Sequence, residues 1–343
     1  MPVEKINIER LFELQNDRVV IDVRTPAEFA QGHIIGAHNL PLFTDEERVV
    51  VGTIYKKQSP EKALLQGLEF TGKKMPAYIK SAKKIAPDKK LIVHCWRGGK
   101  RSGSMAWLLD LAEFDVLTIE GGYKSYRNYL HTYFEKPFHF RILGGKTGTG
   151  KTEILKCLEQ IGEQVIDLEG LANHKGSAFG ALGELPQPYT EHFENMLFEK
   201  LRSLDHSKPI WVENESRGIG KIFIPEGIWT QMRNSTMYNV EIPHELRLLR
   251  SVKDYQANSC DELTAIFKKI ESKLGGKNCQ EAIQALEAGD YTKAAEIALV
   301  YYDKTYQHSQ DRSSFPLIKR LSFDHADMMQ IAKSLSEESN KTA

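Results

Sequence analysis

Residues 91–102 read LIVHCWRGGKRS. An apolar run at 91–94 leads into a turn with two adjacent glycines, and a helical pattern follows at 102–111. A short apolar strand, a glycine turn and a helix in this order are typical of a parallel sheet whose strands are joined by helices. Strand patterns at 19–23 and 116–119 and helix patterns at 26–31 and 123–134 continue the alternation. The sequence therefore predicts an α/β fold for this part of the chain.

A second stretch, GKTGTGKT at residues 145–152, satisfies the phosphate-loop pattern G-x-x-x-x-G-K-[ST]. A strand pattern at 138–143 precedes it and a helix pattern at 153–158 follows, which is the context that the motif requires. Further strand patterns lie at 164–167, 209–213 and 237–242. From residue 246 onward the pattern is helical without a strong strand signal, and we expect residues 336–343 to be a disordered tail.

The chain has 343 residues, of which 41% are hydrophobic and 27% are charged. This composition suits two packed domains and excludes a disordered or fibrous protein. Lys136-Pro137 interrupts the pattern, so we predict one α/β domain at 1–135 and a parallel-sheet P-loop domain with a helical C-terminal part at 136–343. The four cysteines are far apart, which argues against a zinc ribbon or a disulfide framework. We expect a cytoplasmic protein without a membrane segment, because no run approaches the ~20 apolar residues of a span.

Cys95 stands where the strand at 91–94 meets the glycine turn. Backbone N–H groups of such a turn, together with a helix N-terminus, form an anion-binding nest. With Arg97, Lys100 and Arg101 nearby, the nest is expected to lower the pKa of the thiol and to make Cys95 a catalytic nucleophile. The alternative is a buried strand-end cysteine with incidental basic neighbours. The residues expected to bind the anion are Trp96, Arg97, Gly98, Gly99, Lys100, Arg101 and Ser102.

In the phosphate loop, backbone N–H groups would hold a diphosphate, Lys151 would neutralise it and the Thr152 hydroxyl would be a ligand for Mg²⁺. No segment specifies an adenine, so the motif indicates a polyphosphate and not ATP in particular. The residues predicted to bind the diphosphate are Gly145, Lys146, Thr147, Gly148, Thr149, Gly150, Lys151 and Thr152.

Four other charged residues are possible supports of the phosphate loop. Asp167 and Glu213 end apolar strands, where each either positions a metal or a water molecule or is an ordinary strand-end acid. Arg247 and Arg250 are three residues apart and so share one face of a helix. They would either clamp a phosphate or face solvent, and solvent is the favoured interpretation.

Residues 5–130 resemble the rhodanese family. The matching stretches are DVRTPAEF at 22–29, GHIIGAHNLP at 32–41, the cysteine loop and IEGGY at 119–123. The resemblance implies that Cys95 carries a chalcogen in a persulfide-type intermediate, whereas Asp22, Arg24 and Glu28 are expected to stabilise the domain. The loop from Cys95 to Arg101 has seven residues. Sulfurtransferases of this fold more often have six, whereas rhodanese-fold phosphatases have seven. A phosphate-derived anion is therefore expected in place of thiosulfate.

The whole chain resembles the tRNA 2-selenouridine synthase family, through the order of its two domains, the cysteine loop, the phosphate loop and DLEGLANHKGSAFG at 167–180. The resemblance implies a selenotransferase that replaces sulfur by selenium at C2 of wobble 2-thiouridine in tRNA. Selenophosphate is the implied donor, which Cys95 would attack and whose selenium it would carry to C2. It also implies an S-geranylated intermediate made from geranyl diphosphate, whose diphosphate Lys151 and Mg²⁺ would hold at the phosphate loop.

Residues 73–101 carry ten basic side chains and one acidic one, and this stretch, with Lys124 and Arg127, is a candidate surface for tRNA phosphates. An ordinary lysine-rich helix facing water explains residues 73–90 equally well.

Two other functions remain open: a phosphatase of the C-x₅-R type, and a non-catalytic binding module whose phosphate loop is a nucleotide switch. The aromatic cluster Tyr301-Tyr302-Asp303-Lys304-Thr305-Tyr306 favours core packing over a prenyl pocket. The pattern leaves the oligomeric state open.

Overall fold

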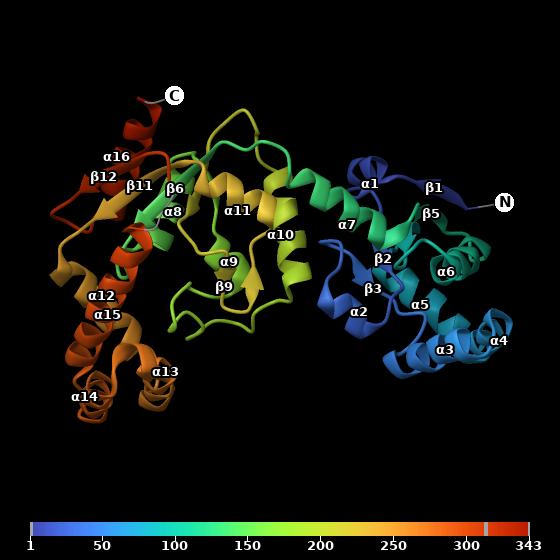
Figure 1. Cartoon of the computed structure of the whole chain (residues 1–343). Helices are drawn as coiled ribbons and strands as arrows, with labels where there is room; N and C mark the ends of the chain where they lie inside the picture. The colour runs from blue at the N-terminus through green and yellow to red at the C-terminus, as the bar shows by residue number, and fades with distance from the viewer. Residues whose placement is uncertain (1–2, 312–314, 342–343) are drawn as a thin grey trace. The chain divides into compact units, whose positions relative to one another are not determined.

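The computed structural model of the protein describes residues 3–311 and 315–341, and it divides into two compact units. Residues up to 134, together with residues 191–199, form the first unit, and residues 135–190 and those from 200 onward form the second. Figure 1 colours the chain from its N-terminus to its C-terminus. Residues 191–199, which we placed in the second domain, therefore belong by their contacts to the first unit.

The first unit is built around a five-stranded parallel sheet with the order β1-β5-β4-β2-β3. Strand β4 lies in the middle, so the residues that follow it are at the centre of the sheet's carboxyl edge. The elements are β1 (Glu4–Ile6), α1 (Ile8–Leu14), β2 (Val19–Asp22), α2 (Pro26–Gln31), β3 (His38–Asn39), α3 (Asp45–Lys57), α4 (Pro60–Gly72), α5 (Met75–Ile85), β4 (Lys90–His94), α6 (Lys100–Leu111), β5 (Asp115–Ile119) and α7 (Gly122–Tyr133).

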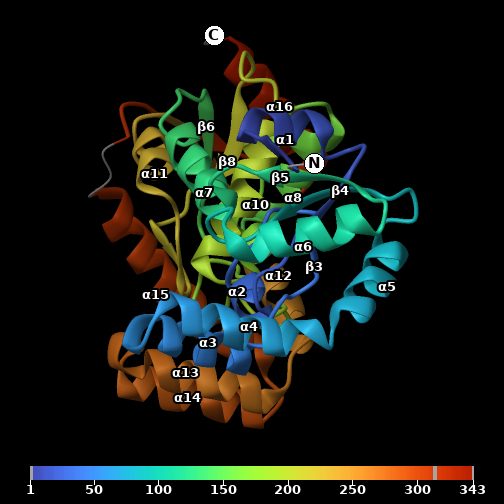
Figure 2. The ribbon, with the colours of Figure 1, turned by 90° about the vertical axis from the view of Figure 1, so that its right-hand side faces the viewer.

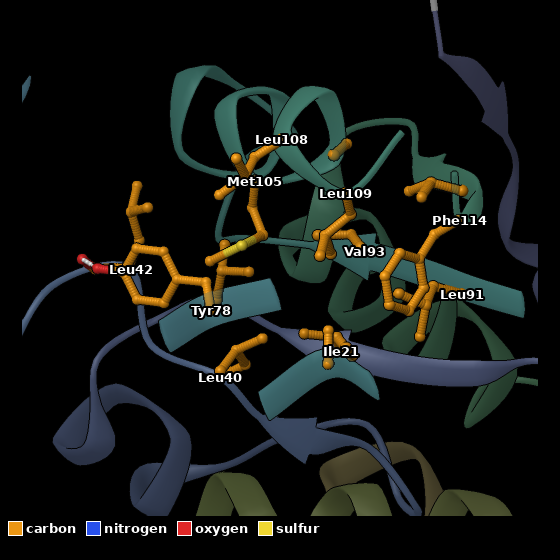
Figure 3. Close-up of a cluster of buried hydrophobic side chains, with 14 of the residues drawn as sticks. Ile21, Leu40, Leu42, Tyr78, Leu91, Val93, Met105, Leu108, Leu109 and Phe114 are labelled. Atoms are coloured by element: carbon orange, nitrogen blue, oxygen red, sulfur yellow. Dashed lines mark hydrogen bonds between the residues drawn. The ribbon is translucent and has the colours of Figure 1, made fainter. Parts of the chain in front are cut away.

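Helices α5 and α6 cover one face of this sheet, and Figure 3 shows the core between them and the strands. Ile21, Leu91 and Val93 come from the strands, and Met105 and Leu109 from α6. All five side chains are almost fully buried, as expected for strands of a parallel sheet covered by helices. The predicted strand and helix around the cysteine are therefore present, and their packing fixes the start of α6.

Residues 191–199 of α10 (Thr190–Arg202) pack on the first unit through aromatic and polar contacts. The Phe198 ring lies 5.0 Å from the Tyr133 ring and 5.7 Å from the Phe12 ring, measured between centroids. Arg127 of α7 forms an ion pair with Glu194 and donates to Asn195 Oδ1 at 2.7 Å. These contacts explain why this segment groups with α1 and α7.

The second unit has its own five-stranded parallel sheet, with the order β12-β11-β6-β8-β7 and β6 in the middle. A two-stranded antiparallel pair, β9 and β10, lies outside it. Besides α10, the elements are β6 (Phe140–Gly145), α8 (Lys151–Gln160), β7 (Gln164–Ile166), α9 (Leu168–Ala172), β8 (Ile210–Glu213), β9 (Gly218–Ile219), β10 (Ile222–Phe223), α11 (Glu226–Arg233), β11 (Thr236–Glu241), α12 (His244–Gln256), α13 (Cys260–Leu274), α14 (Gly276–Glu287), α15 (Tyr291–Asp311), β12 (Ile318–Ser322) and α16 (Met328–Asn340).

Two expectations about the C-terminal part are wrong. Residues 318–322 form β12, which pairs in parallel with β11 at the edge of the sheet. Its side chains are only partly buried, which explains why the apolar pattern gave no strand signal. The expected disordered tail is instead the end of α16, where Leu335 and Ser339 are buried; residues 342–343 lie outside the described residues.

Helices α13, α14 and α15 pack together with α12 around a separate apolar cluster. Figures 1 and 2 both show α13 and α14 lying side by side, as they also show α3 and α4 in the first unit. The predicted helical C-terminal part is therefore present. Within residues 3–311 and 315–341, no helix combines the length and the apolar character that a membrane crossing needs.

Candidate functional site

Cys95 follows β4 directly, and the turn at Gly121-Gly122 supports its loop from behind. The N–H of Tyr123 donates to Cys95 O, and the N–H of Lys124 donates to Trp96 O, both at 2.9 Å. A Cβ at Gly122 would lie 2.3 Å from Cys95 O, and the residue has a φ of +62°. Only glycine fits such a position without strain. The glycine pair in the IEGGY stretch is thus a structural support of the cysteine loop.

The Cys95 side chain is 2% exposed and its sulfur lies 3.2 Å from Ser102 Oγ. Burial raises the pKa of the thiol, but hydrogen bonds from the Ser102 hydroxyl and from the backbone N–H groups of Ser102, Arg97 and Gly99 outweigh it and leave the pKa below its ordinary value. The direction agrees with the expectation from the sequence. The backbone N–H groups of the expected nest are among the causes, and the Ser102 hydroxyl adds one that the sequence did not indicate.

The three basic residues of the loop differ in their exposure and in their partners. Arg97 and Lys100 are exposed, whereas the Arg101 guanidinium donates to Glu28 at 2.6 and 3.3 Å. Glu28 also accepts the N–H of Thr25 and so caps α2. Arg101 therefore ties the start of α6 to α2, and the exposed cations of the loop are Arg97 and Lys100.

Asp22 and Arg24 form a fully buried ion pair beneath the loop, with Arg24 Nη2 2.6 Å from Asp22 Oδ2. Arg24 also donates to Gly32 O at 2.6 Å, and its guanidinium carbon lies 3.9 Å from the centre of the Tyr123 ring. The Trp96 ring lies 5.6 Å from the same tyrosine ring. These contacts give Asp22 and Arg24 the stabilising role that the sequence suggested.

The phosphate loop connects β6 to α8, so it lies at the centre of the second sheet's carboxyl edge, where ligands of such folds bind. Gly150 has a φ of +86° and caps α8, and Lys151 Nζ donates to Gly145 O at 3.2 Å. The N–H of Thr149 donates to Lys146 O at 3.1 Å. The loop thus has the glycine turn, the helix N-terminus and the lysine that a diphosphate requires.

Arg247 of α12 supports this loop, which corrects the favoured solvent-facing interpretation. It is 4% exposed, donates to Thr147 O at 3.0 Å and forms an ion pair with Asp303 at 2.7 Å. A Cβ at Gly148 would come within 2.8 Å of Arg247 O, so α12 and the loop are in close contact. Arg250, by comparison, is partly exposed and pairs with Glu153 of α8.

The aromatic cluster of α15 divides between two environments. Tyr302 accepts the N–H of Ala178 and packs with Phe179 in the helical core, as expected. Tyr306 instead accepts the N–H of Gly145 at 2.9 Å and donates to Asn239 Oδ1 at 2.7 Å. Tyr306 is thus a support of the phosphate loop that the sequence pattern did not identify.

A cluster of acidic side chains lies beside the phosphate loop. Glu213 is fully buried at the end of β8, and its Oε1 accepts the N–H of Glu169 at 2.6 Å. Glu169 Oε2 lies 3.4 Å from the Thr152 hydroxyl, and Glu169 also interacts with Glu215. Asp167 caps α9 by accepting the N–H of Gly170. The sequence identified Asp167 and Glu213 but missed Glu169 and Glu215.

Burial raises the pKa of Glu213, and the neighbouring carboxylates Asp167, Glu169 and Glu215 raise it further. The pKa values of Glu169 and Glu215 are raised in the same direction, chiefly by burial. Lys151 opposes this rise in both residues. Burial and mutual repulsion therefore disfavour the charged forms of these three crowded carboxyl groups, and the lysine of the phosphate loop favours the charged forms of Glu169 and Glu215.

The stretch at 167–180 covers these acids. A Cβ at Gly176 would come within 2.7 Å of the Glu215 carboxylate and 2.8 Å of the Glu169 carboxylate. Phe179 anchors the far end of the stretch in the helical core. The sequence left open whether this loop binds a substrate or covers the sheet. In the structure, Gly176 of the loop lies directly against the carboxylates of Glu169 and Glu215.

The oxygen atoms near Thr152 suit Mg²⁺, because this ion takes one or two carboxylates with phosphate oxygens and water. The Thr152 hydroxyl and the Glu169 carboxylate provide two such atoms, and Glu213 Oε2 is buried without a hydrogen-bond partner. Among residues 3–311 and 315–341, no group of three His, Cys, Asp or Glu side chains has the arrangement of an all-protein metal site. The residues fit a cation that is held together with a diphosphate.

The structure shows which basic side chains of the proposed tRNA surface are exposed and which are paired. Lys80, Lys83 and Lys84 of α5 are exposed, and α5 contains no acidic residue. Lys74, however, is paired with Glu47 at 2.5 Å. Arg127, with its ion pair to Glu194, is occupied within the first unit, so we remove it from the proposed surface.

Two family models match the chain, one in each predicted domain. Residues 8–129 match the rhodanese-like domain, and residues 138–339 match the tRNA 2-selenouridine synthase AAA domain. A solved structure, the N-terminal domain of a putative ATP/GTP binding protein from Clostridium difficile 630, is 37% identical and covers 37% of this chain and 98% of its own, with a TM-score of 0.35.

Curated relatives match over most of the chain. The tRNA 2-selenouridine synthase of Nitrosomonas europaea is 33% identical over 349 residues, which covers 86% of this chain and 90% of that protein. The tRNA 2-selenouridine synthase of Bdellovibrio bacteriovorus is 35% identical over 365 residues, which covers 91% of this chain and 94% of that protein. With both family models in the same order, this chain belongs to the tRNA 2-selenouridine synthase family.

Proposed function

We propose that this enzyme replaces sulfur by selenium at C2 of wobble 2-thiouridine in tRNA, with selenophosphate as the donor and an S-geranylated base as the intermediate. The observation that carries the proposal is the buried Cys95 thiol, whose pKa is lowered by hydrogen bonds of a loop suited to an anion. The names of the relatives support the reaction, and the two loops support its division into two steps.

In the first step, the sulfur of 2-thiouridine attacks C1 of geranyl diphosphate. A carbon–sulfur bond forms, pyrophosphate leaves and the base loses its N3 proton. Lys151 and the N–H groups of the phosphate loop would stabilise the departing charge. Mg²⁺ held by Thr152 and Glu169 would neutralise the same charge. S-alkylation makes the sulfur a better leaving group, because it can then depart as a thiolate.

In the second step, the Cys95 thiolate attacks selenophosphate within its loop. Attack at phosphorus breaks the phosphorus–selenium bond and releases selenide, which adds to C2 while geranyl thiolate leaves. Water then releases phosphate from the cysteine. Selenium keeps the same oxidation state throughout, so no reductant is needed. Attack at selenium would instead give the persulfide-type intermediate that the resemblance implied, with selenium carried on Cys95. That intermediate needs two further electrons to deliver selenide, so we propose attack at phosphorus. Exposed Arg97 and Lys100 would attract the donor anion.

Binding of tRNA is assigned to the exposed lysines of α5, with Lys100 at the cysteine loop. A surface of this kind binds phosphates by counterion release, so affinity for tRNA should fall steeply as salt is raised. The wobble base must leave its stack to reach either loop. The balanced net charge of the chain agrees with a local surface and not with a general positive field.

The test is nucleoside mass spectrometry of 2-thiouridine-containing tRNA after incubation with the full-length protein, geranyl diphosphate and selenophosphate. Unmutated protein should give 2-selenouridine. Cys95→Ser should accumulate the S-geranylated nucleoside, and Lys151→Ala should leave 2-thiouridine. Unaltered 2-thiouridine in every sample, with binding of tRNA confirmed, would refute the proposal. Hydrolysis of an aryl phosphate in that case would favour a phosphatase.

A further inference from the structure

An apolar groove of about 430 Å³ lies between α4 and α6 of the first unit. Leu42, Tyr78 and Met105 form its buried floor, and Figure 3 shows these three side chains at one end of the core. Leu68 of α4 and Trp107 of α6 form its rim and are 49% and 55% exposed. We call this feature the α4–α6 groove. Its apolar rim is exposed to solvent, which is the property of a surface that binds something apolar.

The hydroxyl groups that line the groove already have acceptors on the backbone. Tyr78 donates to Leu42 O at 2.8 Å, Thr71 donates to Gly67 O at 2.9 Å, and Ser104 donates to Lys100 O at 2.7 Å. A ligand in the groove therefore meets hydrocarbon and satisfied polar groups. Such a lining favours an alkyl or alkenyl chain over a sugar or a peptide backbone, which would bring unpaired polar groups.

The groove begins at the cysteine loop. Lys100, a residue of the loop from Cys95 to Arg101, lines it together with Gly103. From Lys100 to Leu108 the groove follows α6 for about 12 Å, at 1.5 Å per residue. A ligand bound at the loop can therefore place an apolar chain along α6 from Lys100 onward.

We propose that the α4–α6 groove holds the geranyl chain of the S-geranylated base while selenium replaces sulfur. The inference rests on the proposed function and adds the place of the leaving group. The carbon–selenium bond forms and the carbon–sulfur bond breaks at the same C2 atom, so the geranyl thiolate must leave from beside Cys95. Lys100, at the loop end of the groove, is placed for the phosphates of the nucleotide that bears the chain.

Gly103→Leu tests the proposal with little risk to the fold. A Cβ at Gly103 has no other atom within 4 Å, so the new side chain projects into open space at the groove, and leucine favours a helix more than glycine does. Gly72→Leu is the matched control, because Gly72 is equally open but does not line the groove. A second pair is Trp107→Ala, which removes part of the rim, and Leu111→Ala, which removes an exposed apolar side chain of α6 outside the groove.

The measurement is the affinity of each full-length variant for two anticodon stem-loop RNAs, one with 2-thiouridine and one with S-geranyl-2-thiouridine at the wobble position. Excluding even two methylene groups from an apolar site changes affinity about tenfold. Unmutated protein, Gly72→Leu and Leu111→Ala should bind the geranylated RNA at least tenfold more tightly. Gly103→Leu and Trp107→Ala should lose most of this preference and keep their affinity for the RNA without geranyl.

Selenium incorporation from the geranylated RNA, measured beside binding, separates this inference from the proposed function. If Gly103→Leu and Trp107→Ala keep the preference, the groove does not hold the chain. If unmutated protein has no preference yet forms 2-selenouridine, the groove assignment is wrong and the proposed function stands. If it shows neither the preference nor 2-selenouridine, both proposals are wrong.

Discussion

Replacing Ser102 with alanine should make the Cys95 thiolate rarer at neutral pH. The Ser102 hydroxyl is 3.2 Å from the sulfur and is the largest of the influences that lower the pKa of this thiol. A hydrogen bond to a charged group is worth ~1.5–3 kcal/mol. The hydroxyl also lies 3.2 Å from Gly99 O, so its single proton is shared between two acceptors and the lower end of that range applies. At a fixed pH below the pKa, Ser102→Ala should therefore lower the thiolate fraction about tenfold.

The assay is the rate of Cys95 alkylation by iodoacetamide as a function of pH, followed by peptide mass spectrometry on the full-length protein. The profile of Ser102→Ala should move to higher pH. Ser104→Ala is the control, because its hydroxyl donates to Lys100 O on the same helix and has no contact with the sulfur. An unchanged profile in Ser102→Ala, or an equal change in both variants, would contradict the hydrogen-bond explanation of the lowered pKa.

Three further predictions concern the supports of the two loops. Gly122→Ala, which places a Cβ 2.3 Å from the carbonyl oxygen of Cys95, should abolish selenium transfer while geranylation continues, as nucleoside mass spectrometry would show. Arg247→Leu should cost about 2 kcal/mol in urea unfolding and weaken binding of geranyl diphosphate, whereas Arg250→Ala should cost less than about 1 kcal/mol. Burial raises the pKa of Asp22, but His94 and Arg24 outweigh burial and leave that pKa lowered. The stabilisation that Asp22 provides is therefore present at neutral pH and is lost as the pH falls from the ordinary carboxyl value through the lowered one, which thermal unfolding between about pH 5 and pH 2 should show. Arg24→Leu should cost about 3–5 kcal/mol at pH 7.

Most of both sheets could be predicted because their strands are short apolar runs, and β4, β5 and β6 run into glycine turns. Strand β12 could not, because an edge strand needs little apolar material and residues 318–322 read IKRLS, which is neither an apolar run nor a strict alternation. The error at α16 was avoidable. Met328, Ile331, Ala332 and Leu335 have the spacing of one buried helix face, although the polar residues after 335 resemble a tail.

The two loops could be found from the sequence because each is a continuous motif after a strand. Their supports come from distant parts of the chain, so spacing along the sequence does not reveal them. Glu169 and Glu215 become neighbours only when the end of β8 and the start of α9 meet beside the phosphate loop. Tyr306 reaches Gly145 from α15, which is separated from it by more than a hundred residues.

Residues 191–199 also have a consequence for the order of events during synthesis. Domains generally begin to fold as they leave the ribosome, N-terminal part first. Phe198, which packs edge-on against the Tyr126 and Tyr133 rings, emerges only after β6 and the phosphate loop. Until then the aromatic face of α7 is uncovered, so the first unit cannot complete its packing when residue 134 has been made. A fragment that ends at residue 134 would therefore expose the apolar rings of α7 to solvent. A fragment meant to fold as the first unit must also contain residues 191–199 of α10.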